Sequence, residues 1–353
     1  MALTYASRNP FKSVVDSHAL PRIIQTDKNL YGAAFHLMKL LPAQFILRSA
    51  ADSGELQPDT TVVETTSGTF GLGLAMVCRL RGNPLVLVGD PAIDAPLRRR
   101  LEALGARVHI VSGPELRAKG VQQARLERVA RIQEKLGTYF TPGQYDNPLN
   151  PVSYGAVAEL LMESLGTIDA LVCPVGSGGS SSGIGSFLRA VNPKLRLIGV
   201  DTIGSVLFGA PAGPRQLRGL GNGLIPRVLD HTLFDEVHWL DAPSAFLATR
   251  QLHARHAVYQ GPTSGAAHHV ASWYAEQNPD QRVVALYPDE GHRYTSTVYN
   301  DAWMRRNDLL LSEASPAPRT LDHPAQAEGA WSRYAWNRRT HDDVVRLTDG
   351  PTS

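Results

Sequence analysis

The residues of this 353-residue chain best suited to covalent chemistry are its lysines, and there are few of them. Nearly all basic residues are arginines, and the lysines are Lys12, Lys28, Lys39, Lys119, Lys135 and Lys194. A lysine amine can attack a carbonyl carbon and, when neutral, can accept a proton. Any reaction that requires such an amine therefore has few candidates, and the sequence around each lysine must distinguish them.

A loop of small residues follows the apolar stretch 171–175 and precedes a predicted helix. The loop consists of Gly176, Ser177, Gly178, Gly179 and Ser180. Glycines let the backbone approach a ligand closely, and free N–H groups at a helix start attract anions. The pattern predicts a phosphate site. A flexible linker and a dinucleotide loop are the alternatives, although neither a Walker lysine nor the G-x-G-x-x-G spacing is present.

A second polar loop follows the apolar stretch 61–64 and also precedes a predicted helix. It contains Thr66, Ser67, Gly68 and Thr69. Hydroxyl and N–H groups at a helix start suit a carboxylate. One loop for a phosphate and one for a carboxylate together indicate an amino acid bound beside a phosphorylated cofactor.

The elements that must position these loops alternate between short apolar strands and helices. Such alternation is typical of βα units and a mainly parallel sheet, which places the chain in the α/β class. The predicted strands are 61–64, 84–88, 107–111, 170–175, 195–200 and 283–286, and the predicted helices are 71–81, 93–104, 121–136, 152–165 and 187–191.

Six segments in order resemble those of the cysteine synthase and cystathionine β-synthase family, which are pyridoxal 5′-phosphate (PLP) enzymes of fold type II. The resemblance extends over about residues 15–300 and rests on the two loops together with 144–151, 220–226, 261–267 and 288–297. It implies two three-layer α/β domains with mainly parallel sheets, and a homodimer. The expected division is a large PLP-binding domain of residues 1–39 and 149–311, a small substrate-loop domain of residues 40–148, and a C-terminal tail of residues 312–353 at the surface.

The family's lysine normally lies in an S-x-K-D-R motif, which this chain lacks. Counting back from the Thr66 loop places Lys39 at that position, whereas counting forward from Leu20 places Leu47 there. Pro42 suits the first turn of a helix that would end near Gly54, and the family keeps its lysine just before such a helix. We therefore expect Lys39 to carry PLP as a Schiff base. The Leu47 register would instead make the chain an inactive relative.

The resemblance also implies the remaining site residues. The substrate carboxylate is expected at Thr66, Ser67, Gly68, Thr69 and Gln144. The cofactor is expected at Lys39, Thr69, Gly176, Ser177, Gly178, Gly179, Ser180, Asp289 and Glu290. Thr69 replaces the family's loop asparagine. Asp289 or Glu290 replaces the serine opposite the pyridine nitrogen, with Glu290 the better register, and a carboxylate there would keep that nitrogen protonated.

The expected reaction is β-replacement on an activated serine, either O-acetylserine or O-phosphoserine. A thiol, sulfide or other nucleophile would then give cysteine or a related β-substituted alanine. An arginine such as Arg218 would favour phosphate as the leaving group. The alternatives are a β-elimination lyase on cysteine or serine, a catalytically inactive binding protein and a nucleotide-dependent oxidoreductase.

Composition narrows the other possibilities. The formal net charge is +2 and charged residues make up 19% of the chain, so no nucleic-acid or membrane partner is expected. Cys78 and Cys173 lie in apolar runs, and no signal peptide is recognised at the N-terminus. These features predict a cytoplasmic protein. The adjacent His268 and His269 lack companions at ligand spacing, so no metal site is predicted.

Overall fold

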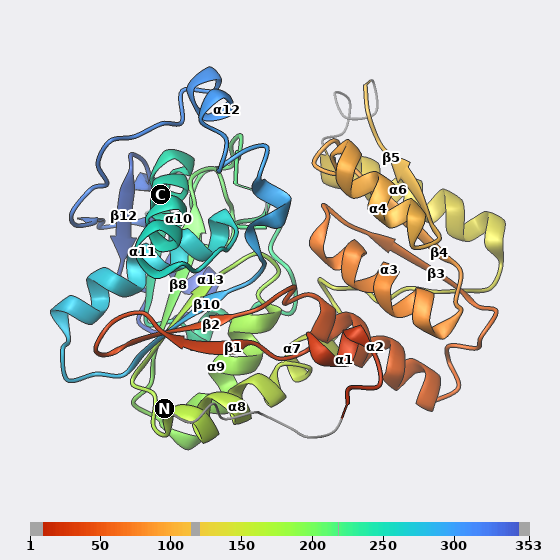
Figure 1. Ribbon diagram of the computed structural model, residues 1–353, viewed down its shortest axis with the longest axis horizontal. Helices are drawn as coiled ribbons and strands as arrows, with labels where there is room; N and C mark the ends of the chain where they lie inside the picture. Colours follow the sequence, from red (N-terminus) through yellow and green to blue (C-terminus); the bar gives the residue numbers. More distant parts are fainter. Residues whose placement is uncertain (1–9, 114–120, 218, 346–353) are drawn as a thin grey trace, which may run out of the picture.

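The chain folds around two separate β-sheets, which lie in two lobes side by side (Figure 1). The computed structural model describes residues 10–113, 121–217 and 219–345. The larger lobe contains an eight-stranded sheet in the order β1-β2-β10-β7-β8-β9-β12-β11, and the smaller contains a four-stranded sheet in the order β5-β4-β3-β6. The central pairs are parallel, which confirms the predicted α/β fold with mainly parallel sheets.

The larger sheet is formed by the N-terminal hairpin and by strands from the second half of the chain. Its central strands are buried on both faces, as expected for apolar runs covered by helices. The strands are β1 (Arg22–Gln25), β2 (Leu30–Ala34), β7 (Ala170–Pro174), β8 (Arg196–Thr202), β9 (Glu236–Leu240), β10 (Val283–Tyr287), β11 (Arg319–Thr320) and β12 (Trp331–Tyr334). The helices of this part of the chain are α7 (Leu149–Val152), α8 (Gly155–Leu165), α9 (Gly179–Val191), α10 (Ala242–His256), α11 (Pro262–Gln277), α12 (Asp301–Arg306) and α13 (His341–Val345), with short 3-10 helices η1 (His231–Leu233), η2 (Gly291–Tyr294) and η3 (Pro324–Gln326).

The smaller lobe follows the alternation read from the sequence. Its strands are β3 (Thr61–Thr65), β4 (Leu85–Gly89), β5 (Ala106–Ile110) and β6 (Tyr139–Phe140). Its helices are α2 (Leu40–Asp52), α3 (Thr69–Arg81), α4 (Ala95–Ala103) and α6 (Val121–Leu136), and the short α1 (Val14–Ser17) lies near α2 (Figure 1). The helix expected after Lys39 is therefore confirmed as α2, which ends before Gly54 at φ +81°. The domain boundaries at residues 39–40 and 148–149 stay a proposal.

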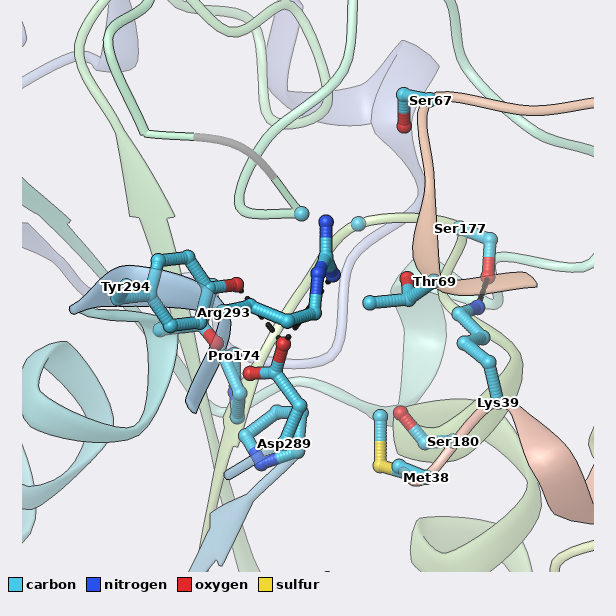
Figure 2. Close-up of a pocket in the computed structure, with 14 residues that line it drawn as sticks. Met38, Lys39, Ser67, Thr69, Pro174, Ser177, Ser180, Asp289, Arg293 and Tyr294 are labelled. Carbon is cyan, nitrogen blue, oxygen red and sulfur yellow. Dashed lines mark hydrogen bonds and ion pairs between the residues drawn. The ribbon is translucent and has the colours of Figure 1, made fainter. Parts of the chain in front are cut away.

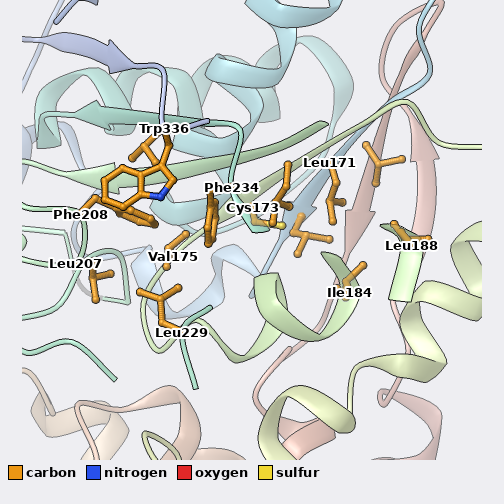
Figure 3. Close-up of a cluster of buried hydrophobic side chains, with 14 of the residues drawn as sticks. Leu171, Cys173, Val175, Ile184, Leu188, Leu207, Phe208, Leu229, Phe234 and Trp336 are labelled. Carbon is orange, nitrogen blue, oxygen red and sulfur yellow. The ribbon is translucent and has the colours of Figure 1, made fainter. Parts of the chain in front are cut away.

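Each sheet is sandwiched between apolar clusters. In the larger lobe one cluster contains Phe208, Phe234 and Trp336, and Figure 3 shows these rings packed beside Val175 and Cys173 of the β7 region. Phe208 contacts the other two rings edge-on, with centroid distances of 5.0 and 5.2 Å. Among the described residues, no helix is both long and apolar enough to cross a membrane.

The chain after residue 311 differs from the surface tail that we expected. β12 pairs antiparallel with β9 at the edge of the larger sheet, and Trp331 is 3% exposed. Trp331 Nε1 donates a hydrogen bond to Nδ1 of the buried His238 at 3.0 Å. Burial of this ring and of Trp336 stabilises the packing of this segment against the larger sheet. The prolines and polar residues nearby in the sequence gave no indication of this burial.

This packing predicts that Trp331→Ala lowers the free energy of unfolding by about 3–5 kcal/mol, because a large buried ring is replaced by a cavity. Urea denaturation measures the change. The matched control is Leu310→Ala, because Leu310 is 44% exposed and its loss is expected to change stability by no more than about 0.5 kcal/mol. Equal unfolding free energies for the two variants would contradict the placement of β12 in the core.

Candidate active site

Lys39 is the N-cap residue of α2 and its amine lies in the cleft between the lobes (Figure 2). Its Nζ donates a hydrogen bond to Ser177 Oγ at 2.7 Å, so the lysine meets the glycine-rich loop across 138 positions of sequence. None of the ion pairs between described residues involves Lys39. Burial lowers the pKa of Lys39 to about 8, which makes a neutral amine accessible near neutral pH. Leu47 is fully buried in the core of the smaller lobe and lines neither part of the cleft described below.

The lowered pKa of Lys39 predicts the pH dependence of its reaction with an aldehyde. The neutral amine is the reactive form, and with a pKa of about 8 its fraction rises about tenfold between pH 7 and pH 9 and then levels off. We expect the rate at which the apoprotein binds added PLP covalently, followed by visible absorbance, to track this curve. A rate that keeps rising tenfold per pH unit above pH 9 would indicate an ordinary exposed lysine instead.

The glycine-rich loop joins the end of β7 to the start of α9. Gly178, at φ +85°, is the N-cap of α9, and no side chain caps the helix there. A Cβ on Gly176 would lie 2.7 Å from the Gly219 carbonyl oxygen, so the loop has no room for larger residues. Ser177 and Ser180 line the cavity, and uncapped backbone N–H groups stand beside their hydroxyls. This donor set fits a phosphate group.

The Thr66–Thr69 loop joins β3 to α3 in the smaller lobe. Thr66 Oγ1 accepts hydrogen bonds from the backbone N–H groups of Gly68 and Gly71, both at 3.0 Å, which folds the loop on itself. Ser67 and Thr69 line the same cavity as Lys39. The N-cap residue of α3, Gly68, has no side chain to cap the helix, so apart from the Gly71 N–H bonded to Thr66, the N–H groups of the first residues of α3 remain available to an anion such as a carboxylate.

Gln144 completes the set of polar groups that the structure brings together. Its Nε2 donates to the Thr65 carbonyl oxygen at 3.2 Å, next to the loop, and its side chain lines the wider part of the cleft. This wider part is a cavity of about 420 Å³, and a narrower one of about 60 Å³ shares Lys39, Ser67 and Ser177 with it in its lining. Together they offer space for a cofactor ring and an amino acid.

Asp289 and Glu290 differ in position, and of the two it is Asp289 that lines the cavity. Asp289 is 3% exposed and lines the narrow cavity, where it accepts a hydrogen bond from Tyr294 Oη at 2.8 Å and has Arg293 Nη1 at 3.5 Å. Glu290 instead pairs with Arg22 and with His36 Nδ1 at 2.9 Å, outside the cavity. Both residues form isolated bridges with neighbouring extended chain, and successive side chains of an extended chain point to opposite sides. Burial raises the pKa of Asp289.

Sequence reasoning assigned no role to several residues that the structure places at the cleft. Tyr294, Arg293 and Thr263 line the narrow part. In the wider part, Arg125 forms a buried ion pair with Asp90 at 3.0 Å. Tyr294, Arg293 and Thr263 lie in segments 261–267 and 288–297, whose resemblance to the family could have identified them. No pattern in the sequence near Asp90 or Arg125 indicates that the two residues form an ion pair. Arg218, considered for leaving-group recognition, lies outside the described residues.

The cleft thus brings together the amine of Lys39, the uncapped glycine-rich start of α9, a second polar loop and the buried carboxyl group of Asp289, a set of groups that suits an amino acid beside a phosphorylated aldehyde. Residues 37–289 match the family model described as pyridoxal-phosphate dependent enzyme, and the chain belongs to this family. PLP is therefore its cofactor. The uncapped start of α9 and the amine of Lys39, which has no acidic partner among the described residues, fit the phosphate and the aldehyde respectively.

Comparison with individual proteins shows which members of this family the chain resembles. The chain is 35% identical over 271 residues to N-(2-amino-2-carboxyethyl)-L-glutamate synthase of Cupriavidus metallidurans, covering 75% of this chain and 79% of that one. It is 31% identical over 291 residues to a cysteine synthase of Staphylococcus aureus, covering 81% and 91%. The structure of the O-acetylserine dependent cystathionine β-synthase from Helicobacter pylori matches with a TM-score of 0.75 at 25% identity, covering 83% of this chain and all of that one. The resemblance to the fold type II family is thus confirmed.

Proposed function

We propose that this enzyme replaces the β-substituent of an activated L-serine with a nucleophile, using PLP held on Lys39. The observation that carries the proposal is the position of Lys39, whose amine lies between the phosphate cradle at Ser177 and the carboxylate loop at Ser67 and Thr69. PLP, when bound, withdraws electrons from the α-carbon of an amino acid, so that a leaving group can depart from the β-carbon. The name of the Helicobacter pylori enzyme, an O-acetylserine dependent cystathionine β-synthase, supports an activated serine as the substrate.

Each residue has a distinct task in this proposal. The N–H groups and hydroxyls of residues 176–180 would hold the phosphate. Ser67, Thr69 and Gln144 would orient the substrate carboxylate, which fixes the Cα–H bond toward Lys39. Once released from the cofactor, the Lys39 amine would take the Cα proton, and its pKa of about 8 suits a base near neutral pH. Asp289 would face the pyridine nitrogen.

Two kinds of nucleophile follow from the relatives. A cysteine synthase joins sulfur to the β-carbon, whereas the name N-(2-amino-2-carboxyethyl)-L-glutamate describes a β-carbon bonded to an amine nitrogen. The homodimer and the cytoplasmic location that the family resemblance and the N-terminal sequence suggested stay part of this proposal.

Product analysis tests the proposal. The purified enzyme with PLP is incubated with O-acetyl-L-serine or O-phospho-L-serine, together with sulfide or L-glutamate, and the products are identified by mass spectrometry. We expect one pairing to yield a β-substituted alanine. Pyruvate and ammonia as the only products in every pairing would replace the proposal with β-elimination, and no turnover of any serine ester would refute both.

A further inference from the structure

A buried carboxylate in the smaller lobe has no role in the chemistry described above. Glu64 is the fourth residue of β3 and is 2% exposed. Among the ion pairs between described residues none includes it, so its partners are backbone groups. A carboxylate removed from water is unfavourable unless hydrogen bonds replace its hydration. Its position therefore requires a specific set of donors.

Those donors come from two separate segments. Glu64 Oε1 accepts from the N–H of Thr65 at 2.8 Å, at the base of the Ser67–Thr69 loop. Its other oxygen, Oε2, accepts from the N–H of Gly143 at 2.7 Å, 79 positions away in the sequence. The next residue is Gln144, whose Nε2 donates to the Thr65 carbonyl oxygen. The carboxylate thus ties together the two segments that supply the polar groups lining the substrate side of the cleft.

The Gln144 segment is also fixed by a hydrogen bond from Asn150. Asn150 Nδ2 donates to the Gln144 carbonyl oxygen at 2.6 Å, and Asn150 is fully buried next to the start of α9. Gly143 has φ +66°, a conformation that turns its N–H toward the interior at little cost for glycine. Glu64 therefore joins the Gln144 segment to β3 at Gly143, beside the bond from the Gln144 side chain to Thr65.

We infer that Glu64 is a positioning residue, which holds Gln144 at a fixed distance from Ser67 and Thr69 so that the two segments bind the substrate carboxylate together. The inference rests on the proposed function, because it concerns the amino-acid substrate. Donors that are already fixed bind an anion without a further loss of conformational entropy. Without the tie, the side chain of Gln144 would keep its bond to Thr65 and its carbonyl group would keep the bond from Asn150, but the neighbouring Gly143 would lose its anchor to β3 and the carboxylate site would widen.

The test compares an amino acid with its uncharged amide in the PLP-loaded enzyme. L-Serine and L-serinamide are titrated separately into wild-type protein, Glu64→Gln and Glu64→Asp, and the visible absorbance of the cofactor reports binding. Glutamine keeps the size but can accept only one of the two N–H bonds, and aspartate is too short to reach both. We expect the preference for serine over serinamide to fall about 10- to 100-fold in each variant. In turnover of the serine esters, KM should rise while kcat stays nearly unchanged.

The matched control is Asp235→Asn, which alters a buried carboxylate bonded to Arg189 and Arg338, none of which lines the cleft. It is expected to lower stability and leave the serine-to-serinamide preference at the wild-type value. A wild-type preference in Glu64→Gln or Glu64→Asp would overturn the inference while leaving the proposed function intact. A wild-type enzyme whose spectrum responds to neither ligand would overturn the proposed function, and the inference with it.

Discussion

Replacing Lys39 with alanine is expected to abolish the visible absorbance band of the PLP-loaded protein and to lower kcat by at least about 10²- to 10⁴-fold. Two roles are lost together, because the same amine would hold the cofactor covalently and take the Cα proton of the substrate. No other lysine among the described residues lines the cleft. Absorbance spectra of wild-type and variant protein after incubation with PLP, followed by kinetics with the serine esters, measure both effects.

Lys194→Ala is the matched control for this prediction, since Lys194 is exposed on the surface of the larger lobe. It removes a lysine and a charge without touching the cleft, and the band and the activity should survive. A visible band of wild-type intensity in Lys39→Ala would contradict the assignment. In that case another amine holds the cofactor. A wild-type protein without any visible band after incubation with PLP would instead favour the Leu47 register, in which the family's lysine is lost.

The second large effect is expected from Asp289→Asn, which should lower kcat about 10- to 100-fold while PLP remains bound. A buried carboxylate facing the pyridine nitrogen stabilises a proton there, and a neutral amide does so far less well. Tyr294 and Arg293 lie within reach of the same carboxylate and oppose the rise in its pKa that burial causes. They therefore help Asp289 to stay ionised, as this role requires.

The neighbouring acid supplies the comparison. Glu290→Gln removes a carboxylate that pairs with Arg22 and His36 outside the cavity, and its kcat should stay within a factor of about three of wild type, as for most changes outside a site. Steady-state kinetics and absorbance spectra of both variants decide between the two positions. A larger loss in Glu290→Gln than in Asp289→Asn would restore the register preferred from the sequence.

Local patterns were sufficient to predict much of this structure. Apolar runs such as 283–286 and 170–175 became central strands, because a strand buried on both faces needs little else to identify it. The helix after Lys39 was predicted from Pro42 and Gly54, which act within a few residues of the helix ends. Both polar loops lie where a strand ends and a helix begins, so their place in the cleft followed from the α/β fold.

Features that depend on distant residues could not be predicted in this way. Asp289 and Glu290 are adjacent and equally acidic, and only their bridges to Leu37 and Gln260 decide which carboxylate enters the cavity. The bond from Glu64 to Gly143 spans 79 positions and leaves no local pattern. The place of Trp331 in the larger sheet depends on β9, about 90 residues earlier in the sequence.

Reduction of the PLP-loaded protein with borohydride, followed by peptide mass spectrometry, tests the central claim most directly. Borohydride makes the bond between the cofactor and its lysine permanent, so the modified peptide reveals which amine held it. The structure predicts a pyridoxyl group on the peptide that contains Lys39, and on no other. Modification of a different lysine, or an unmodified Lys39 in protein that has bound PLP, would contradict the account.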